Sequence, residues 1–394
     1  MTGPLEGVRV VAFEQAIALP FGSMILSEMG ADVIKIERPG SGDVVRGWDD
    51  VVKGLSSGFV SFNVGKRDLA VDVAHPDGKQ VVLDLAQRAD VFLENFSPGV
   101  TARLGLGHKD LMKANDRLIY CSLSGYGQDG PFRDVKAFDL LIQGESGLLF
   151  TNGNEGAPAK VGMPITDLIG GAHVAFGILG ALLKRESTGQ GSYLDVALLE
   201  STLFWLGYFP HYQWHGVPQP PLRGMRHQFI CPYGPFRAAD GRFVNVAVAS
   251  QPHWIAFCEQ VLERPDLIKD PRFETLLSRN KNNVALDGLI EDSFEQHPHG
   301  YWIEKLERAR LPYGLVREMS EVVDHPQLVH RRSIVEADSP VGTIPAVRMP
   351  GSDRNDRRIP ELGQDSVDIL AELGYGDSRI QHLLEAGVIS GPSE

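Results

Sequence analysis

An isolated acidic residue, Asp167, lies at the beginning of an apolar segment rich in glycine and alanine, which reads LIGGAHVAFGILGALLKR over 168–185. Asp is a favoured N-cap residue, so its side chain could simply begin a helix over this segment. The side chain could also act as a nucleophile, because an ionised carboxylate can attack an acyl group and the positive end of a helix dipole favours the ionised form. The two roles are compatible, and the spacing alone leaves both open.

The helix expected after Asp167 carries small residues on several sides. Gly170 and Gly171 lie near its beginning, where each glycine costs about 1 kcal/mol relative to alanine. A close neighbour, either another stretch of backbone or a bound ligand, would account for that loss. Lys184 and Arg185 suit the negative end of the helix dipole, where the helix is expected to end.

Basic residues gather in the segments that follow expected strands and in nearby loops. They are Arg38, Lys66, Arg67, Arg103 and Lys136. Each of them could be an ordinary surface cation. Taken together, on a chain with a formal net charge of -13, they indicate a phosphate-bearing ligand. The same negative charge counts against a nucleic-acid partner.

Other chemistries receive less support from the sequence. His211 and His215 have the i, i+4 spacing of a metal pair, but no third ligand lies close in the sequence, so no metal is expected. Cys121, Cys231 and Cys258 are far apart, which predicts neither a disulfide framework nor a zinc site. No G-x-S-x-G motif is present, and its absence counts against serine hydrolysis.

The first half of the chain alternates between apolar runs and helix-like periods. Strands are expected at 8–14, 32–37, 90–96 and 118–125, with a helix over 78–89. This alternation predicts an α/β fold with a parallel sheet that carries helices on its faces.

Ligands of such sheets bind beyond the carboxyl ends of the strands. That rule places Glu37–Pro39, Asn95–Phe96 and Ser124–Gly127 on the expected binding rim. The first strand is followed by QAIALPFGS and not by G-x-G-x-x-G, which counts against an oxidoreductase with a nicotinamide or flavin dinucleotide.

The character of the chain changes at 216–225, where GVPQPPLRGM is rich in proline and glycine. A hairpin with its turn at Asp240–Gly241 is expected next. We therefore expect the N-terminal part of a large domain at 1–215, a small α+β domain at 216–329 and a return to the large domain at 330–394. Neither a signal peptide nor an uninterrupted apolar run of about 18 residues is visible, so we expect a cytoplasmic protein without a membrane span.

Several longer motifs together resemble the class III CoA-transferases, the superfamily of formyl-CoA transferase and carnitine CoA-transferase. The matching segments are VVAFEQAIALPFGSMILSEMGADVIKIERPGSGDVVRGW, FNVGKRDLAVD, ADVFLENFSPGVTARLGL, SLSGYGQDGP and GMPITDLIGGAHVAFGILGALLKRESTGQG. The resemblance extends over essentially the whole chain. It implies a large Rossmann-like parallel-sheet domain and a smaller α+β domain, in a homodimer whose two chains interlock.

The resemblance also implies a role for Asp167. The carboxylate would attack an acyl-CoA thioester, pass through a mixed anhydride and become an enzyme-CoA thioester, and an acceptor carboxylate would repeat the exchange in reverse. Coenzyme A and its acyl thioester are then substrates, and no permanently bound cofactor is expected.

The resemblance further assigns a set of CoA-binding positions. Among them, Arg38 and Arg103 would meet the adenosine and phosphate end of CoA, and Lys136 would meet a phosphate as well. Asp139 falls where the family often has a second acid near the active carboxylate. The full set is Ile17, Ala18, Arg38, Val71, Asp72, Val73, Ala74, Asn95, Phe96, Arg103, Lys136, Ala137 and Phe138.

Departures from the family pattern bear on the acceptor. Formyl-CoA transferases have glutamine at the position of Ile17 and lysine at that of Ala74, and AVASQPHW lacks their glycine-rich lid. QGESGLLFTNGNEGAPAKVG and RHQFICPYGPF resemble members that act on four- and five-carbon dicarboxylates. We therefore expect succinyl-CoA as donor and itaconate, mesaconate, citramalate or a similar dicarboxylate as acceptor. Arg46, Arg226 and His227 are candidate cations for the distal carboxylate, although each could instead form a surface ion pair.

Two further alternatives come from this resemblance. An α-methylacyl-CoA racemase would need a histidine base where this chain has Phe138. A catalytically silent CoA-binding protein would have no use for Asp167, so the presence of that residue argues against it.

Overall fold

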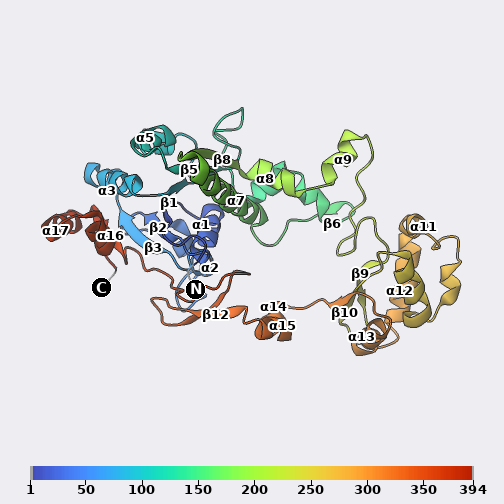
Figure 1. The fold of residues 1–394 in the computed structure, drawn as a ribbon. Coiled ribbons are helices and arrows are strands. Elements are labelled where there is room, and N and C mark those ends of the chain that lie inside the picture. The colour runs from blue at the N-terminus through green and yellow to red at the C-terminus, as the bar shows by residue number, and fades with distance from the viewer. Residues whose placement is uncertain (1–2, 393–394) are drawn as a thin grey trace. The chain divides into compact units, whose positions relative to one another are not determined.

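The computed structural model describes residues 3–392 (Figure 1). Within these residues the central sheet has the strand order β14-β3-β2-β1-β4-β5-β8, and its strands pair in parallel except that β14 runs antiparallel to β3. The strands are β1 (Arg9–Phe13), β2 (Asp32–Glu37), β3 (Arg67–Val71), β4 (Val91–Glu94), β5 (Ile119–Ser124), β8 (Ser192–Ala197) and β14 (Ile389–Ser390).

The parallel sheet predicted from the sequence is confirmed. The four expected strands correspond to β1, β2, β4 and β5, whereas β3, β8 and the edge strand β14 were not anticipated. The strand order reverses between β1 and β4, as in doubly wound folds, and ligands bind at that point in such folds.

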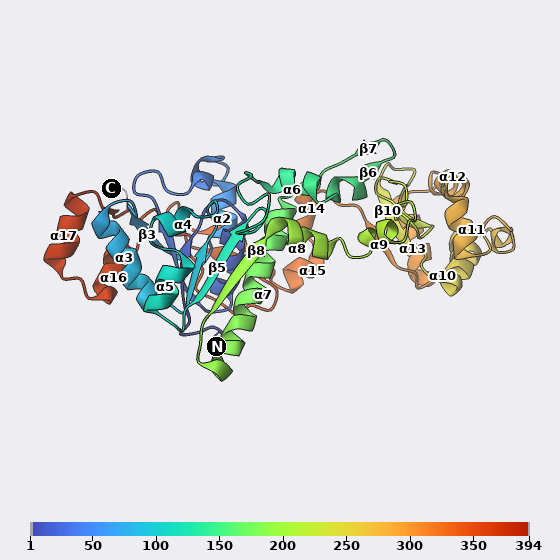
Figure 2. The same ribbon diagram turned by 90° about the horizontal axis from the view of Figure 1, so that it is seen from above.

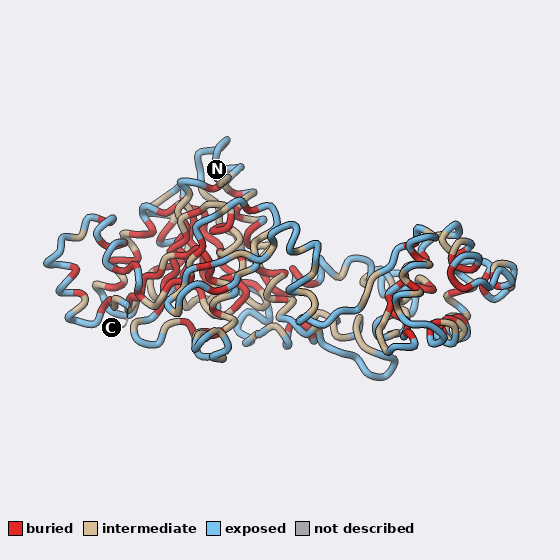
Figure 3. Tube along the Cα trace, turned by 90° about the horizontal axis from the view of Figure 1, so that it is seen from below, coloured by how far each residue is buried: buried red, intermediate tan, exposed pale blue. Residues whose placement is uncertain are grey.

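Helices cover both faces of the sheet (Figure 2). One face packs against α1 (Ala18–Glu28) and α7 (Ile165–Thr188). The other packs against α3 (Pro76–Gln87), α5 (His108–Ala114), α16 (Ser366–Leu373) and α17 (Asp377–Glu385). The strands are therefore buried on both sides, which explains their continuous runs of aliphatic residues (Figure 3).

Glycines bring α1 and α7 into backbone contact. A Cβ atom added to Gly171 would lie 2.4 Å from the carbonyl oxygen of Ala18, and one added to Gly22 would lie 2.7 Å from the carbonyl oxygen of Gly171. The close neighbour expected from the sequence is thus another helix backbone. At Gly170 an added Cβ would instead meet the side chain of Leu198 at 2.3 Å.

The start of α7 differs from the expectation. The helix begins at Ile165 after Pro164, so Asp167 lies inside its first turn and caps nothing with its side chain. The predicted N-cap role of Asp167 is therefore wrong. Proline at 164 fixes the backbone just before the helix and lets the helix start earlier than an Asp cap would.

Among the described residues, α7 is the one helix long and apolar enough to cross a membrane by length and composition alone. Nine of its residues are buried, and they pack against α1 and the sheet. The central helix of a globular α/β unit has the same composition, so this property is weak evidence for a membrane span.

The remaining elements of the first unit surround the sheet ends and add a small satellite core. In that core the C-terminal hairpin contributes Ala337 and Ile344, next to Ile17, Val45 and Phe59. The elements are the short turn Val44–Gly47, α2 (Ser57–Phe62), α4 (Val100–Arg103), α6 (Asp139–Glu145), α8 (Leu198–Trp205), α15 (Pro326–His330), β12 (Ile334–Ala337) and β13 (Ile344–Val347). The turn Leu148–Thr151 begins at the end of one segment of this unit and continues into the second unit.

The second unit has its own core beneath an antiparallel sheet of order β11-β10-β9. The hairpin expected around Asp240–Gly241 is confirmed, because β9 and β10 pair on either side of that turn. Its elements are β6 (Gly153–Asn154), β7 (Ala157–Pro158), α9 (Phe209–Trp214), β9 (Tyr233–Arg237), β10 (Phe243–Ala247), α10 (Gln251–Ala256), the π-turn Phe257–Val261, the turn Pro265–Ile268, α11 (Leu276–Lys281), α12 (Asn283–Phe294), α13 (His299–Arg308), β11 (Tyr313–Leu315) and α14 (Met319–Val322).

Internal contacts divide the described chain into one unit of 3–148, 161–207 and 326–392 and another of 149–160 and 208–325. Residues 149–160 thus join the second unit, although the sequence placed them in the large domain. Among the contacts that hold them there, Asn154 forms a bridge with Arg223, and Nε2 of Gln228 donates to the carbonyl of Thr151 at 3.0 Å. The expected limits of the folding domains, 1–215, 216–329 and 330–394, otherwise stay a prediction.

The α1–α7 contact predicts a position-specific effect of alanine. Gly171→Ala forces its Cβ against the Ala18 carbonyl, so we expect the free energy of unfolding to fall by about 1–3 kcal/mol, as in other overpacked cores. Gly180→Ala is the control, because no described atom outside α7 lies within 4 Å of its added Cβ. That variant should gain up to about 1 kcal/mol from helix propensity. Urea unfolding measures both, and equal effects would contradict the contact.

Candidate active site

A cavity of about 400 Å³ opens at the carboxyl ends of β1, β4 and β5, where the strand order reverses. Asp167 lines it. The other walls come from the loop after β1, the loop after β4, the turn after Asp43 and the segment before α6. The predicted residues that line the cavity are Ile17, Ala18, Asn95, Phe96, Lys136, Ala137, Phe138 and Asp167.

Asp167 lies in the first turn of α7 and is partly buried. No hydrogen bond to its carboxylate is found within residues 3–392. Burial, followed by the negative charge of Asp139, raises the pKa of Asp167 to about 7. The sequence led us to expect a carboxylate stabilised in its ionised form by the helix dipole. These two effects outweigh the dipole, and the acid titrates near neutral pH.

Asp139 begins α6 and is held rigidly beside Asp167. Its Oδ1 accepts hydrogen bonds from the backbone N–H and the hydroxyl of Thr166, at 2.8 and 2.9 Å. Its Oδ2 accepts one from Nε2 of Gln143 at 2.7 Å. The two carboxyl groups are therefore neighbours with unequal environments, since Asp139 has its own donors and Asp167 has none among the described residues.

Two buried residues that line the same cavity have backbone donors without an acceptor among the described residues. Ile17 and Ala18 line it and are 4% and 8% exposed. Their N–H groups precede the first hydrogen bond of α1 and find no acceptor in the described part of the chain. Unpaired donors at a helix start are available to an oxygen of a ligand, including one on which negative charge develops during a reaction.

The loops after β1 and β4 are fastened to each other. Asn95 accepts a hydrogen bond from the N–H of Gln15 at 3.0 Å and donates one to its carbonyl at 2.9 Å. The rings of Phe13 and Phe96 pack at 4.3 Å between centroids. Asn95 and Phe96 thus support the cavity wall that the sequence placed at the sheet rim.

Cations gather beside the cavity around Gly99. Nζ of Lys136 donates to the hydroxyl of Ser97 at 2.7 Å. Guanidinium nitrogens of Arg103 and Arg133 lie 3.2 and 3.9 Å from the point that a Cβ on Gly99 would occupy. Arg103 does not itself line the cavity, whereas Arg133 does and was missed. Its signal in the sequence was its place in the loop that precedes Lys136.

The other predicted CoA positions lie outside this cavity. Arg38 is exposed directly after β2. Val71 ends β3, and Asp72 caps the following turn by accepting a hydrogen bond from the N–H of Ala74 at 2.9 Å. Arg38 and the stretch from Val71 through Val73 to Ala74 follow the carboxyl ends of β2 and β3. Both strands run parallel to β1, so these residues belong to the same edge of the sheet.

Arg46 is already engaged inside the protein. Its guanidinium forms hydrogen bonds with both oxygens of the Glu37 carboxylate, at 2.7 and 2.9 Å, and lies 3.6 Å from the centre of the Phe59 ring. A guanidinium with these partners is part of the framework. The structure therefore removes the support for Arg46 as the cation of a distal carboxylate.

Arg226 and His227 line a separate cavity of about 390 Å³ inside the second unit. Arg226 forms ion pairs with Asp287, at 2.9 Å, and with Glu291. The ring of His227 stacks on Tyr233, and burial followed by the charge of Arg223 lowers its pKa, which favours the neutral ring. Neither side chain presents a free positive charge.

No group of three or more metal-ligating side chains is found in residues 3–392. His211 on α9 and His215, the residue directly after this helix, stack with nearly parallel rings 5.9 Å apart between centroids. The paired carboxyl groups and the backbone donors of the first unit instead suit acyl transfer, in which a carboxylate attacks a carbonyl carbon and N–H groups bind the developing oxyanion.

The raised pKa of Asp167 predicts a pH-dependent stability difference. The pKa of Asp167 is about 7 in the folded chain, whereas its usual value is 3.8. Between pH 3.8 and pH 7 the folded chain therefore binds a proton that the unfolded chain has lost. As the pH rises through this range, Asp167 lowers the stability of the fold. Asp167→Asn should therefore raise the melting temperature at pH 8, with the gain vanishing below about pH 4. Thermal unfolding at a series of pH values tests this. A gain that is constant with pH would contradict the shift.

Comparison with known proteins gives the family. A sequence profile of CoA-transferase family III matches residues 5–366. The human protein named succinyl-CoA:glutarate CoA-transferase is 34% identical over 395 residues, which cover 98% of this chain and 90% of the relative. Succinyl-CoA:mesaconate CoA-transferase of Haloarcula hispanica is 33% identical over 397 residues, covering 95% and 97%.

A solved structure is similar as well. The crystal structure of a CAIB/BAIF family protein from Brucella suis matches with a TM-score of 0.83 and 31% identity, over 95% of this chain and 100% of that one. The family profile and the solved structure thus both match nearly the whole of this chain. The chain belongs to CoA-transferase family III and is a CoA-transferase.

Proposed function

We propose that this enzyme transfers CoA from succinyl-CoA to a small dicarboxylic acid through covalent intermediates on Asp167. The observation that carries the proposal is an unpartnered, partly buried carboxylate that faces a cavity together with unpaired backbone donors. Such a group can act as a nucleophile without a separate base, because every step exchanges one acyl derivative for another.

The proposed steps balance without net proton transfer. An oxygen of the Asp167 carboxylate attacks the thioester carbonyl, and the CoA thiolate leaves to give a mixed anhydride. The thiolate then attacks the aspartyl carbonyl, which releases succinate and forms an aspartyl-CoA thioester. The acceptor carboxylate attacks the carbonyl of this thioester, which expels the CoA thiolate and forms a second anhydride. Attack of the thiolate on the acceptor's carbonyl finally releases the new acyl-CoA and restores Asp167.

Each attack places negative charge on a carbonyl oxygen, and the N–H groups of Ile17 and Ala18 would stabilise that charge. The cavity must also exclude water, because an anhydride or a thioester hydrolyses. The burial that raises the pKa of Asp167 supports such an exclusion at the carboxylate itself.

Arg103, Arg133 and Lys136 would face the phosphates of CoA. Among the described residues, Arg103 has no carboxylate partner, Lys136 bonds a neutral hydroxyl, and Arg133 pairs at 3.5 Å with the exposed Asp134. The chain has a formal net charge of -13, so cations without a buried carboxylate partner support the binding of an anionic ligand. Arg38 and the stretch Val71–Ala74 would extend the site along the sheet edge.

The names of the relatives support a dicarboxylate acceptor, since glutarate and mesaconate are both five-carbon dicarboxylates. Itaconate and citramalate have the same two acid groups. Arg226 and His227 stay our candidates for the distal carboxylate, on condition that the ion pairs of Arg226 rearrange when the substrate binds. We also propose an interlocked homodimer, as the family resemblance implies. A racemase is disfavoured because Phe138 precedes Asp139 where that chemistry needs a histidine.

Covalent trapping tests the nucleophile. Incubation with succinyl-CoA followed by hydroxylamine or borohydride should modify Asp167, as read by mass spectrometry of peptides. Asp167→Ala should lose transfer by at least about a thousandfold while the Kd for CoA changes less than about threefold. Glu186→Ala, at the exposed far end of α7, is the control and should keep full activity. Unchanged turnover in Asp167→Ala would exclude the mechanism.

The pH dependence of the first half-reaction follows from the same acid. Because only ionised Asp167 attacks, kcat/KM for succinyl-CoA should rise through about pH 7. Asp139→Asn removes the neighbouring negative charge and should move the midpoint to lower pH. A profile that is flat between pH 5.5 and 8.5 would contradict this assignment.

The acceptor class needs its own measurement. A panel of carboxylic acids with succinyl-CoA, read by mass spectrometry of the acyl-CoA products, should show products from four- and five-carbon dicarboxylates. If only oxalate or monocarboxylates react, the dicarboxylate assignment is wrong while the transfer mechanism stands.

A further inference from the structure

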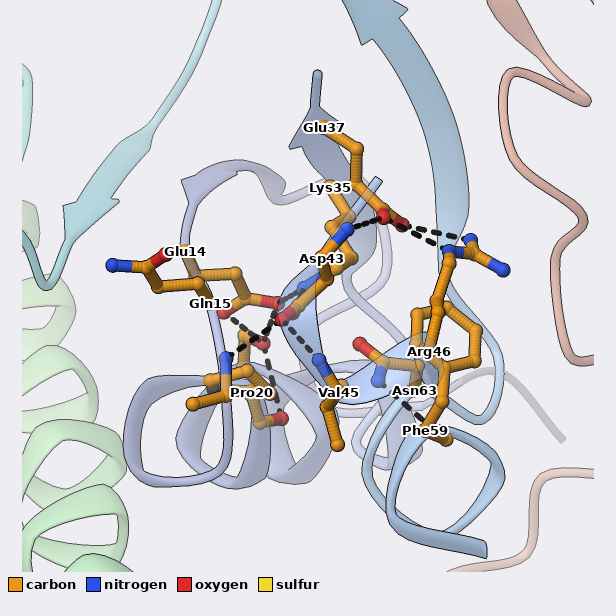
Figure 4. A network of polar contacts seen from close by, with 12 residues as sticks. Glu14, Gln15, Pro20, Lys35, Glu37, Asp43, Val45, Arg46, Phe59 and Asn63 are labelled. Atoms are coloured by element: carbon orange, nitrogen blue, oxygen red, sulfur yellow. Dashed lines mark hydrogen bonds and ion pairs between the residues drawn. The ribbon is translucent and has the colours of Figure 1, made fainter. Parts of the chain in front are cut away.

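Asp43 joins two walls of the Asp167 cavity. Its Oδ1 accepts a hydrogen bond from the N–H of Ala16 at 2.9 Å. The same oxygen accepts one from the N–H of Val45 at 3.1 Å (Figure 4). Ala16 belongs to the loop after β1, and Val45 to the turn Val44–Gly47. Both segments contribute residues to the cavity wall. Asp43 itself is buried and does not line the cavity.

Ala16 needs such a partner because its backbone is strained. Its φ of +62° lies in the left-handed region, which costs a residue with a Cβ about 1–2 kcal/mol. The neighbouring Gln15 is held from the other side by Asn95. The loop therefore turns sharply between two fixed points, and Asp43 supplies the hydrogen bond at the strained residue.

Asp43 is in turn fixed by a buried cation. Nζ of Lys35 donates to Asp43 Oδ2 at 2.8 Å, and both side chains are fully buried. Burial alone would lower the pKa of Lys35, but Glu14 and Asp43 raise it, so the lysine stays charged. Lys35 lies on β2, whose backbone is locked in the sheet. The chain of contacts thus runs from the sheet to the cavity loop.

The loop after β1 leads directly to the two residues whose N–H groups lack an acceptor in the described chain. Ile17 and Ala18 follow the strained residue directly, and their N–H groups have no acceptor among residues 3–392. We propose that Asp43 is a positioning residue for acyl transfer, which holds Ala16 in its left-handed conformation and so aims the N–H groups of Ile17 and Ala18 at the acyl carbonyl. This inference rests on the proposed function of the Asp167 cavity.

The proposal predicts a split between catalysis and binding. Asp43→Asn keeps one acceptor oxygen but loses the charge that Lys35 holds, so the loop should become mobile. We expect kcat with succinyl-CoA to fall by about 10- to 100-fold, as for a misplaced reacting group. The Kd for CoA, measured by calorimetry, should change less than about threefold, because Arg103 and Lys136 are not touched by the substitution.

A second readout does not depend on turnover. Hydrogen–deuterium exchange of the peptide that contains Gln15–Ala18 should accelerate in Asp43→Asn. Asp49→Asn is the matched control, because Asp49 also accepts hydrogen bonds from nearby backbone N–H groups, those of Val51 and Ser57, but contacts nothing in the loop after β1. It should change neither kcat nor exchange.

A glycine at position 16 tests whether Asp43 acts through the left-handed backbone of Ala16. Glycine adopts φ above zero without strain, so Ala16→Gly in the Asp43→Asn background should restore kcat at least fivefold and slow the exchange. If Asp43→Asn acted only by lowering the stability of the whole fold, Ala16→Gly would not restore kcat, because this substitution does not replace the lost charge. If Asp43→Asn does not fold, Ala16→Val decides instead, since a β-branched residue disfavours φ above zero and leaves the buried charges intact.

Two results would overturn the proposal. One is unchanged exchange of the Gln15–Ala18 peptide in Asp43→Asn, or in Ala16→Val where the first variant does not fold. The other is a kcat within twofold of the unsubstituted enzyme in that variant. If the unsubstituted enzyme transfers CoA to no acid of the panel, the proposed function fails by itself, and the exchange experiment still decides whether Asp43 holds the loop.

Discussion

The site depends on the contact between the backbones of α1 and α7. Gly171 lies four residues after Asp167, which is about one helical turn, and it touches the carbonyl oxygen of Ala18 at the beginning of α1. The beginnings of the two helices therefore lie side by side, one carrying the acid and the other the free N–H groups. A side chain at this crossing would separate them. The helix propensity lost at Gly22 and Gly171 is the cost of that approach.

The charges behind the cavity are balanced, whereas the charge inside it is not. The cations Lys35, Lys66 and Arg46 form ion pairs with four carboxyl groups, those of Glu14, Glu37, Asp43 and Asp68. Figure 4 shows Lys35 and Arg46 with Glu14, Glu37 and Asp43. Burial and the charge of Glu37 raise the pKa of Asp68 well above its usual value, so one of the four favours its protonated form. A buried network with matched charges is rigid, because every ion has a partner and removing one leaves another uncompensated.

Asp167 lacks any such compensation. Burial raises its pKa, and the charge that acts on it comes from another acid, Asp139, which raises the pKa further. The protein thus places rigid, neutralised charge behind the loop after β1 and a single uncompensated acid in front of it. Perturbed acids of this kind in a cavity are typical of functional sites.

Local patterns in the sequence were enough for four strands of the sheet, for the rim and for the acid, but not for β3, β8 and β14. Alternation of apolar and helical periods is a local signal, and the strands found at 9–13 and 32–37 follow it. The motif resemblance located Asp167 in the cavity wall with seven other predicted residues. The predicted N-cap role failed because Pro164, three residues earlier, fixes where α7 begins.

The partners of the ionic side chains could not be predicted, because they come from distant parts of the chain. Arg46 looks like a free cation in the sequence, but folding brings it onto Glu37 and Phe59. Asp43 was not singled out in the sequence, and only the packing of β2 against β1 shows that it bonds Ala16. Charge and spacing do not tell a buried ion from a solvated one.

The raised pKa of Asp167 also suits the order of the proposed acyl exchanges. An ordinary side-chain carboxylate has a pKa of about 4.3 and a cysteine-like thiol one of about 8.5. An aspartate near 7 lies between them, so it is a stronger nucleophile than the free substrate acids and is still ionised in part at neutral pH. A fully compensated aspartate would be ionised but weakly basic, and a fully desolvated one would stay protonated. Partial burial beside a second acid keeps Asp167 between these two limits.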